Sequence, residues 1–212
     1  AWWDFRAGWL LEERTALDAV APPIAFPEAP FGQRFAADAH DPAQRERAAR
    51  RALLFAAGYG AGLLVPMGFE YGARRPLDIA RDRPGDWTWL RERAPYDLSG
   101  SVREAAAIAE AMVPLAKGDL RPLSGPGATV VALMRTDSVD PRAAETGALV
   151  LANTDLAAAV TVAPSAMLPG AGGTLTRFAD QDGNAFGPDT AMVLAPGEVR
   201  VLNALPGEKV LL

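Results

Sequence analysis

Two carboxylates in the first 72 residues are placed where they could do chemistry, because each directly follows an apolar segment. Glu28 comes after the segment PIAFP, and Glu70 lies between Phe69 and Tyr71 after the segment GLLVPMG. A carboxylate at the end of a strand can act toward a substrate as an acid, a base or a hydrogen-bond acceptor. The rings beside Glu70 add flat apolar surface for stacking. These two positions are therefore the first candidates for a site.

The composition argues against metal and cofactor chemistry. The 212 residues contain no cysteine and one histidine. These counts exclude disulfides, thiolate metal sites, a cysteine nucleophile and a site built on several histidines. The segment DQDGN, residues 180–184, lacks the later bidentate glutamate of a calcium loop, and we interpret it as a β-turn. We expect no metal ion and no cofactor.

Charge and hydropathy narrow the classes of partner. The formal net charge is −5, and basic residues are interleaved with acidic ones, so we expect no nucleic-acid partner. No apolar run reaches the ~20 residues that span a bilayer, so we expect no membrane partner. The start of the chain lacks the basic residues of a signal peptide and an initiator methionine. We expect a cytoplasmic protein, either processed or cut from a longer one.

Two helices are predicted in the first 60 residues. The spacing of apolar residues predicts a helix over residues 2–20, which is ended by two prolines. A second helix begins at Asp41 as N-cap, with Pro42 at its first position, and ends near Gly58 or Gly60.

A third helix is predicted over residues 99–118. Ser101 and Glu104 have the spacing of a capping box, and Gly118 is the expected C-cap. Residues 73–97, between the second and third helices, carry Pro, Gly and many charges, and we expect them to form a loop.

Strands are predicted on both sides of the second helix, over residues 23–28 and 61–72, and we expect the latter to be buried. After residue 119, six short β-type runs alternate with Gly, Pro, Asn and Asp, a pattern typical of an antiparallel β-sandwich. The predicted fold class is α/β followed by all-β, with domains 1–118 and 119–212.

The first domain is too short to be a complete α/β fold. Two strands alone cannot form a sheet with covered edges. A (β/α)8 (TIM) barrel takes ~250 residues, and about half of that length precedes the β-type runs. We therefore interpret residues 1–118 as the terminal part of such a barrel. We expect the chain alone to be only partly stable, since strand edges would be open.

Four features, in this order along the chain, resemble the C-terminal portion of the α-amylase family (glycoside hydrolase family 13). PIAFPEAPFGQRF is placed like the family's seventh barrel strand and its loop. RALLFAAGYGAGLLVPMGFEYG is similar to the seventh helix and eighth strand, with Gly68, Glu70 and Gly72 matching a Gly-x-Glu-x-Gly-like motif. SGSVREAAAIAEAMVPLAKGDLRPL resembles the last barrel helix, and the β-type runs resemble the C-terminal domain. The tryptophan-rich start and FPE are similar to maltosyltransferase-like members, which build or trim α-glucans.

The resemblance implies that the main catalytic carboxylates lie outside this chain. Retaining glycosidases use two carboxyl groups, and the family carries its nucleophile and its acid/base on earlier strands. A third family carboxylate follows the seventh strand in a His-Asp pair, where this chain has Pro30 and Phe31. A second alignment gives that role to Glu28, which is our catalytic candidate. The structural alternative is an ion pair between Glu28 and Arg34.

The resemblance also implies residues that contact a sugar. The candidate substrate-binding residues are Arg34, Glu70, Tyr71, Trp87 and Trp89. The two tryptophans and Tyr96 could form one stacking wall. The structural alternatives are that Glu70 pairs with an arginine such as Arg74 or Arg75, and that the aromatic residues fix the long loop.

Two functions follow from these expectations. The first is a C-terminal segment of an α-glucan-acting glycoside hydrolase or transglycosylase, inactive alone. Its partners would be an α-glucan or maltooligosaccharide and the missing N-terminal half of the barrel. The alternative is a non-catalytic glucan-binding or assembly protein derived from that fold. The two differ in whether binding of a maltooligosaccharide is followed by turnover.

Overall fold

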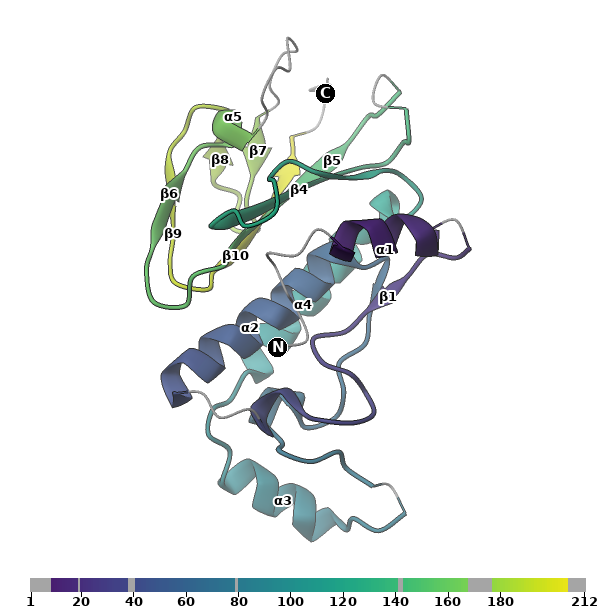
Figure 1. Cartoon of the computed structure of the whole chain (residues 1–212), viewed down its shortest axis with the longest axis vertical. Helices are drawn as coiled ribbons and strands as arrows, with labels where there is room; N and C mark the ends of the chain where they lie inside the picture. Colours follow the sequence, from purple (N-terminus) through teal and green to yellow (C-terminus); the bar gives the residue numbers. More distant parts are fainter. Residues whose placement is uncertain are drawn as a thin grey trace.

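The computed structural model describes residues 9–18, 20–37, 41–78, 80–140, 143–167 and 177–205. Its main body has three layers (Figure 1). Helices α2 (Pro42–Tyr59) and α4 (Ser99–Met112) form the first layer, a six-stranded antiparallel sheet the second, and a two-stranded sheet the third. Helix α3 (Pro84–Glu92) lies at the end of the molecule that is remote from the sheets.

The β-rich part confirms the predicted antiparallel arrangement. The six-stranded sheet has the order β3 (Leu120–Pro122), β4 (Val130–Thr136), β5 (Gly147–Asn153), β10 (Val199–Ala204), β7 (Phe178–Ala179) and β8 (Ala185–Phe186). The two-stranded sheet pairs β6 (Val160–Val162) with β9 (Met192–Leu194), and the short helix α5 (Pro164–Met167) follows β6. Each predicted run contains a strand, whereas β3 and β8 were not predicted. The DQDGN segment forms the predicted turn between β7 and β8, with Gly183 at φ +81°.

The two faces of the six-stranded sheet pack against different layers, because successive side chains of a strand point to opposite faces. Val131 and Leu133 share a core with α2 and α4. Ala132 and Met134 share a second core with β6 and β9. All seven residues of β4 and of β5 are therefore buried, and their sequences are nearly continuous apolar runs.

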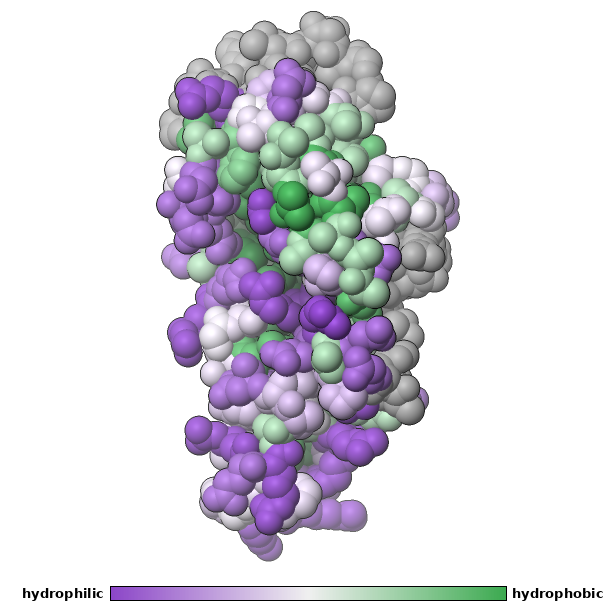
Figure 2. Space-filling model, turned by 90° about the vertical axis from the view of Figure 1, so that its left-hand side faces the viewer, coloured by the Kyte–Doolittle hydropathy of each residue, from purple (hydrophilic) through white to green (hydrophobic). Residues whose placement is uncertain are grey.

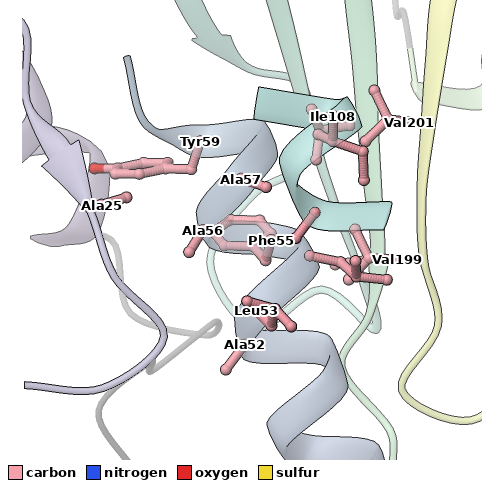
Figure 3. Close-up of a cluster of buried hydrophobic side chains, with 14 of the residues drawn as sticks. Ala25, Ala52, Leu53, Phe55, Ala56, Ala57, Tyr59, Ile108, Val199 and Val201 are labelled. Carbon is pink, nitrogen blue, oxygen red and sulfur yellow. The ribbon is translucent and has the colours of Figure 1, made fainter. Parts of the chain in front are cut away.

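Helix α2 is the central element of the first core. Figure 3 shows Ile108 of α4 and Val199 and Val201 of β10 on one side of α2, and Ala25 on the other. This core crosses the predicted division between residues 118 and 119, so helices of the first part and strands of the second are packed together. The division into domains 1–118 and 119–212 stays a prediction.

Both ends of α2 lie where the sequence predicted them. Asp41 occupies the N-cap position before Pro42, although its side chain makes no capping hydrogen bond, and Gly60 is the C-cap. The first predicted helix is present as α1 (Trp9–Asp18), and residues 2–8 and 19 of that prediction lie outside the described residues. The guanidinium of Arg14 lies 5.2 Å from the ring centre of Tyr59, which holds α1 against the end of α2.

The predicted caps of α4 are wrong. The helix begins at Ser99, so Ser101 and Glu104 lie inside it, and both bind Arg50 of α2: Ser101 Oγ accepts from Nε at 3.2 Å and Glu104 Oε2 from Nη2 at 2.7 Å. The helix ends at Met112 and continues as the 3₁₀ turn η3 (Val113–Leu115). Gly118 is therefore not the C-cap.

The two predicted α/β strands form a parallel pair. Ile24 of β1 (Ile24–Ala25) lies opposite Gly62 of β2 (Gly62–Leu63), with α2 between them in the sequence. Both strands are shorter than predicted. The expectation that the second is buried is wrong, because its residues are half-buried and Leu64 is 42% exposed. In the described part of the chain, β1 and β2 pair only with each other, which leaves their outer edges open.

The sequence predicted that residues 73–97 form a loop, but this segment also contains a helix. In this helix, α3, no residue is buried. Pro84 occupies the start of this helix, and the Arg83 N–H donates to the Asp86 carboxylate at 2.7 Å. The segment extends away from the main body (Figure 1).

One face of the molecule changes character along the long axis. In the face shown in Figure 2, hydrophobic surface is mainly in the upper, β-rich half, and the lower half is mostly hydrophilic. None of the helices in the described ranges combines the length and the apolar character needed to cross a membrane.

Candidate functional site

An enclosed ion pair joins the ends of β1 and β2. Arg34 Nη2 lies 2.5 Å from Glu28 Oε1, and both residues are 2% exposed. The Phe35 N–H donates to Glu28 Oε2 at 2.6 Å. Both terminal nitrogens of Arg34 donate to the Met67 carbonyl, at 3.2 and 3.1 Å. The ion pair between Glu28 and Arg34, which was the predicted structural alternative, is thus present in the structure. The catalytic role of Glu28 stays a prediction.

Burial opposes the charge on Glu28. It raises the pKa of the carboxyl above 4.5, while the Phe35 N–H and the Arg34 guanidinium act in the opposite direction and the nearby charge of Glu70 raises the pKa further. The hydroxyl of Tyr96, which is buried beside this cluster, has no hydrogen-bond partner among the residues that the structure describes. Burial, and then the charge of Glu28, raise the pKa of Tyr96 to about 12. This tyrosine therefore stays protonated.

The Gly-x-Glu-x-Gly-like motif forms a tight turn. Phe69–Tyr71 is the 3₁₀ turn η2, bounded by Gly68 at φ +86° and Gly72 at φ +64°. These left-handed conformations favour glycine. A Cβ on Gly72 would also lie 2.8 Å from Pro95 Cγ. The glycines therefore fix the direction in which the turn presents Glu70.

Glu70 is half-buried and free to contact a ligand. Its side chain makes no ion pair or hydrogen bond in the described part of the chain, so the predicted pairing with Arg74 or Arg75 is absent. Arg75 instead pairs with Asp82, at 2.7 Å. The backbone carbonyl of Glu70 accepts from the Leu98 N–H at 2.8 Å, which ties the turn to the start of α4.

Tyr71 is held by α3. Its ring meets the Trp87 ring edge-to-face, with 5.6 Å between the ring centres. The guanidinium of Arg91 lies 5.5 Å from the centre of the Tyr71 ring. Trp87 and Arg91 are four residues apart and share one face of the helix. Sequence reasoning missed Arg91, because the segment was expected to be a loop and this spacing has meaning only in a helix.

The single aromatic wall predicted from Trp87, Trp89 and Tyr96 is not formed. Trp87 packs on Tyr71, and Tyr96 is buried at 7% exposure. Trp89 is 58% exposed and has the Arg93 guanidinium 5.2 Å from its ring centre. Of the predicted substrate-binding residues, Glu70, Tyr71 and Trp87 therefore come together, whereas Arg34 is enclosed with Glu28 and Trp89 lies elsewhere.

The two carboxylates that follow the strands differ in exposure. Glu28 is enclosed and Glu70 is half-buried, so they do not provide two accessible carboxylates of the kind that glycoside cleavage requires. Within the described ranges, no three His, Asp or Glu side chains are grouped so that they could hold a metal ion.

The chain belongs to the α-amylase family, glycoside hydrolase family 13, as a segment, and its similarity to a curated relative carries this assignment. Over 209 residues it is 40% identical to the alpha-1,4-glucan:maltose-1-phosphate maltosyltransferase of Burkholderia pseudomallei (strain K96243). That match covers 96% of this chain and 18% of the length of the relative. No family model matches the chain.

Three solved structures share the fold at low sequence identity. Eubacterium rectale Amy13B superposes with a TM-score of 0.58 at 15% identity, over 93% of this chain and 42% of that one. The gamma-CGTase from alkalophilic Bacillus clarkii gives 0.55 at 17%, over 87% and 26%. The α-amylase from Geobacillus thermoleovorans, solved with acarbose, gives 0.54 at 14%, over 93% and 43%. At these identities the likeness shows the fold alone.

Proposed function

We propose that the chain is the C-terminal portion of a maltosyltransferase-like enzyme that acts on α-glucans. In this proposal β1 and β2 are the last two strands of a (β/α)8 barrel, and residues 119–212 form its C-terminal β-sandwich domain. The parallel pairing of β1 with β2 carries the proposal, because it brings the residues after both strands to one edge. In barrels of this kind that edge holds the active site. The 40% identity to a maltosyltransferase supports the choice of substrate.

The open groups at this edge would bind the glucan. Glu70 would accept hydrogen bonds from sugar hydroxyls, and Tyr71, held by Trp87, would offer its ring to a pyranose. Arg34 would position the glycine-bounded turn, since it joins Glu28 to the carbonyl of Met67, the residue directly before that turn. A catalytic role for Glu28 would require Arg34 to turn away and open the pair.

The segment would not cleave glycosidic bonds alone. The nucleophile and the acid/base would come from the N-terminal half of the barrel, which is the partner we propose together with an α-glucan or maltooligosaccharide. That half would also cover apolar side chains near β1 and β2 that are exposed here, such as Ile24 at 61% and Met67 at 61%. A cytoplasmic location, expected from the sequence, remains part of the proposal.

The test is reconstitution of transfer. The 212-residue chain is mixed with maltose 1-phosphate and maltoheptaose, and phosphate release is measured with and without the separately expressed preceding part of the Burkholderia relative. We expect no release from the chain alone and release from the mixture. Turnover by the chain alone would refute the assignment of the catalytic carboxylates to the absent part.

The enclosed state of Glu28 favours a second candidate function, a non-catalytic glucan-binding or assembly protein. In that case maltoheptaose would bind, as measured by isothermal titration calorimetry, but the mixture would release no phosphate. If the full-length protein to which this chain belongs has no catalytic carboxylates on its earlier strands, that protein would also bind maltoheptaose without releasing phosphate.

A further inference from the structure

Trp89 lies in a groove separate from the Glu70–Tyr71 turn. The groove, here called the Trp89 groove, has a volume of about 730 Å³ and lies between α3 and the chain that follows η2. Its apolar lining comes mainly from Ala73, Leu77, Trp89, Leu90 and Pro95. Trp87 and Tyr71 are not among the lining residues.

The geometry of α3 explains why the two tryptophans serve different surfaces. Residues two positions apart on an α-helix are separated by about 200° around its axis. Trp87 therefore packs on Tyr71 while Trp89 points to the groove. Trp89 is 58% exposed, and the guanidinium of Arg93 lies 5.2 Å from its ring centre. A large flat indole surface is thus open to a ligand, and such a surface suits the apolar face of a pyranose ring.

The charges around the groove nearly cancel. Arg75 pairs with Asp82 at 2.7 Å, and Arg93 lies 3.7 Å from Glu92. The remaining charged lining residues are Arg74 and Asp86, one of each sign. Arg74 is exposed and makes no ion pair in the described part of the chain, so it can donate hydrogen bonds. Three arginines and Asp86 line the groove, and the partners Asp82 and Glu92 bring the number of carboxylates to three. This balance suits a neutral ligand with many hydroxyl groups better than a highly charged one.

We propose that the Trp89 groove is a second, non-catalytic binding site for an α-glucan chain. A glucose unit would stack on Trp89, and Arg74 and Asp86 would hydrogen-bond to its hydroxyls. The choice of an α-glucan as the neutral ligand rests on the proposed function. A site of this kind would hold a long glucan near the barrel edge independently of the residues that carry out transfer.

The experiment measures maltoheptaose binding to the 212-residue chain by isothermal titration calorimetry. Trp89→Ala should weaken binding about tenfold or more, as loss of an aromatic anchor does. Trp89→Phe, which keeps an aromatic ring, should recover most of the affinity. Val193→Ala is the matched control, because Val193 is equally exposed at 59% but lies on β9. It should leave the affinity unchanged.

A second variant separates binding from stability. Arg74→Ala removes an exposed side chain, so the melting temperature of this variant should stay within about 2 °C of that of the unsubstituted chain. Its affinity for maltoheptaose should fall. The proposal is overturned if the unsubstituted 212-residue chain shows no detectable binding of maltoheptaose. It is also overturned if neither Trp89→Ala nor Arg74→Ala changes the affinity. Phosphate release in the reconstitution experiment is a separate readout, so failure of the groove and failure of the proposed function are distinguishable.

Discussion

Glu28 and Arg34 form an ion pair that connects the ends of two neighbouring parallel strands. Oε1 of Glu28 lies 2.5 Å from Nη2 of Arg34, and Arg34 also donates to the carbonyl of Met67, which follows β2. The residues are six positions apart in the sequence, but the carbonyl is more than thirty positions away. The direction of the turn that carries Glu70 therefore depends on a side chain from the preceding strand–helix connection.

Replacing Arg34 by methionine should destabilise the protein strongly at neutral pH. The substitution leaves the Glu28 carboxylate buried without its cation, and breaking a buried ion pair in this way costs about 3–5 kcal/mol. Urea denaturation gives the change in the free energy of unfolding. The exposed pair of Arg75 and Asp82 is the control, and Arg75→Met should have a far smaller effect because solvent screens exposed pairs.

The destabilisation by Arg34→Met should also depend on pH. The folded state raises the pKa of Glu28 above 4.5. Protonation of Glu28 therefore contributes its full stabilisation below about pH 4.5, and this stabilisation is lost as the pH rises through the folded-state pKa. Loss of Arg34 raises that value further, so the variant should lose less stability at about pH 4 than at about pH 8. In the double variant Glu28→Gln, Arg34→Met this dependence should disappear. A loss that is equal at both pH values would contradict the account.

Arg135 joins the six-stranded sheet to the ends of two helical segments. It is 0% exposed and donates to the carbonyls of Gly58 at 3.1 Å, Gly60 at 2.6 Å and Leu115 at 3.2 Å. Arg135→Met should cost about 3 kcal/mol or more, because buried acceptors lose their donors. The stability of Arg135→Lys should lie between those of the unsubstituted protein and Arg135→Met, since a single ammonium group cannot span all three carbonyls. Thermal melting of the three proteins gives the order, and a lysine variant as stable as the unsubstituted protein would show that donor geometry does not matter here.

Gly118 is required by a close approach of two chain segments. A Cβ at this position would lie 1.7 Å from the carbonyl oxygen of Thr136, which is backbone and cannot move aside alone. Gly118→Ala should therefore cost about 3 kcal/mol, at the upper end of overpacking effects. Gly125→Ala is the matched control, because no atom lies within 4 Å of its added Cβ. Urea midpoints of the two variants that differ by little would contradict the packing argument.

Local patterns in the sequence were sufficient for the elements that local chemistry specifies. The Asp41–Pro42 start and the Gly60 end of α2 depend on backbone preferences that neighbouring residues set, and both are confirmed. The strands β4 and β5 were predicted correctly, because a nearly continuous apolar run between turn residues fits few structures other than a buried strand. By contrast, α3 was missed because Pro84 and Gly85 were interpreted as loop residues, whereas proline is compatible with the first helical position.

Features that depend on tertiary contacts could not be predicted in the same way. Ser101 and Glu104 have capping-box spacing, but α4 begins two residues earlier and Arg50 of another helix binds both side chains. The pairing of Glu28 with Arg34 was foreseen as an alternative, since the residues are close in sequence. The separation of Trp89 from Trp87 required the helix, because residues two positions apart have no fixed relationship in a loop.

Glu70→Gln should reduce transfer without affecting the fold. In the reconstituted enzyme of the proposed function, we expect kcat/KM to fall about 10- to 100-fold, because a neutral amide accepts hydrogen bonds from sugar hydroxyls less strongly than a carboxylate does. The melting temperature should stay unchanged, since the Glu70 side chain makes no ion pair or hydrogen bond in the residues that the structure describes. Tyr71→Phe keeps the ring that contacts Trp87 and Arg91 and should retain most of the activity. An unchanged kcat/KM for Glu70→Gln would show that this carboxylate does not face the substrate.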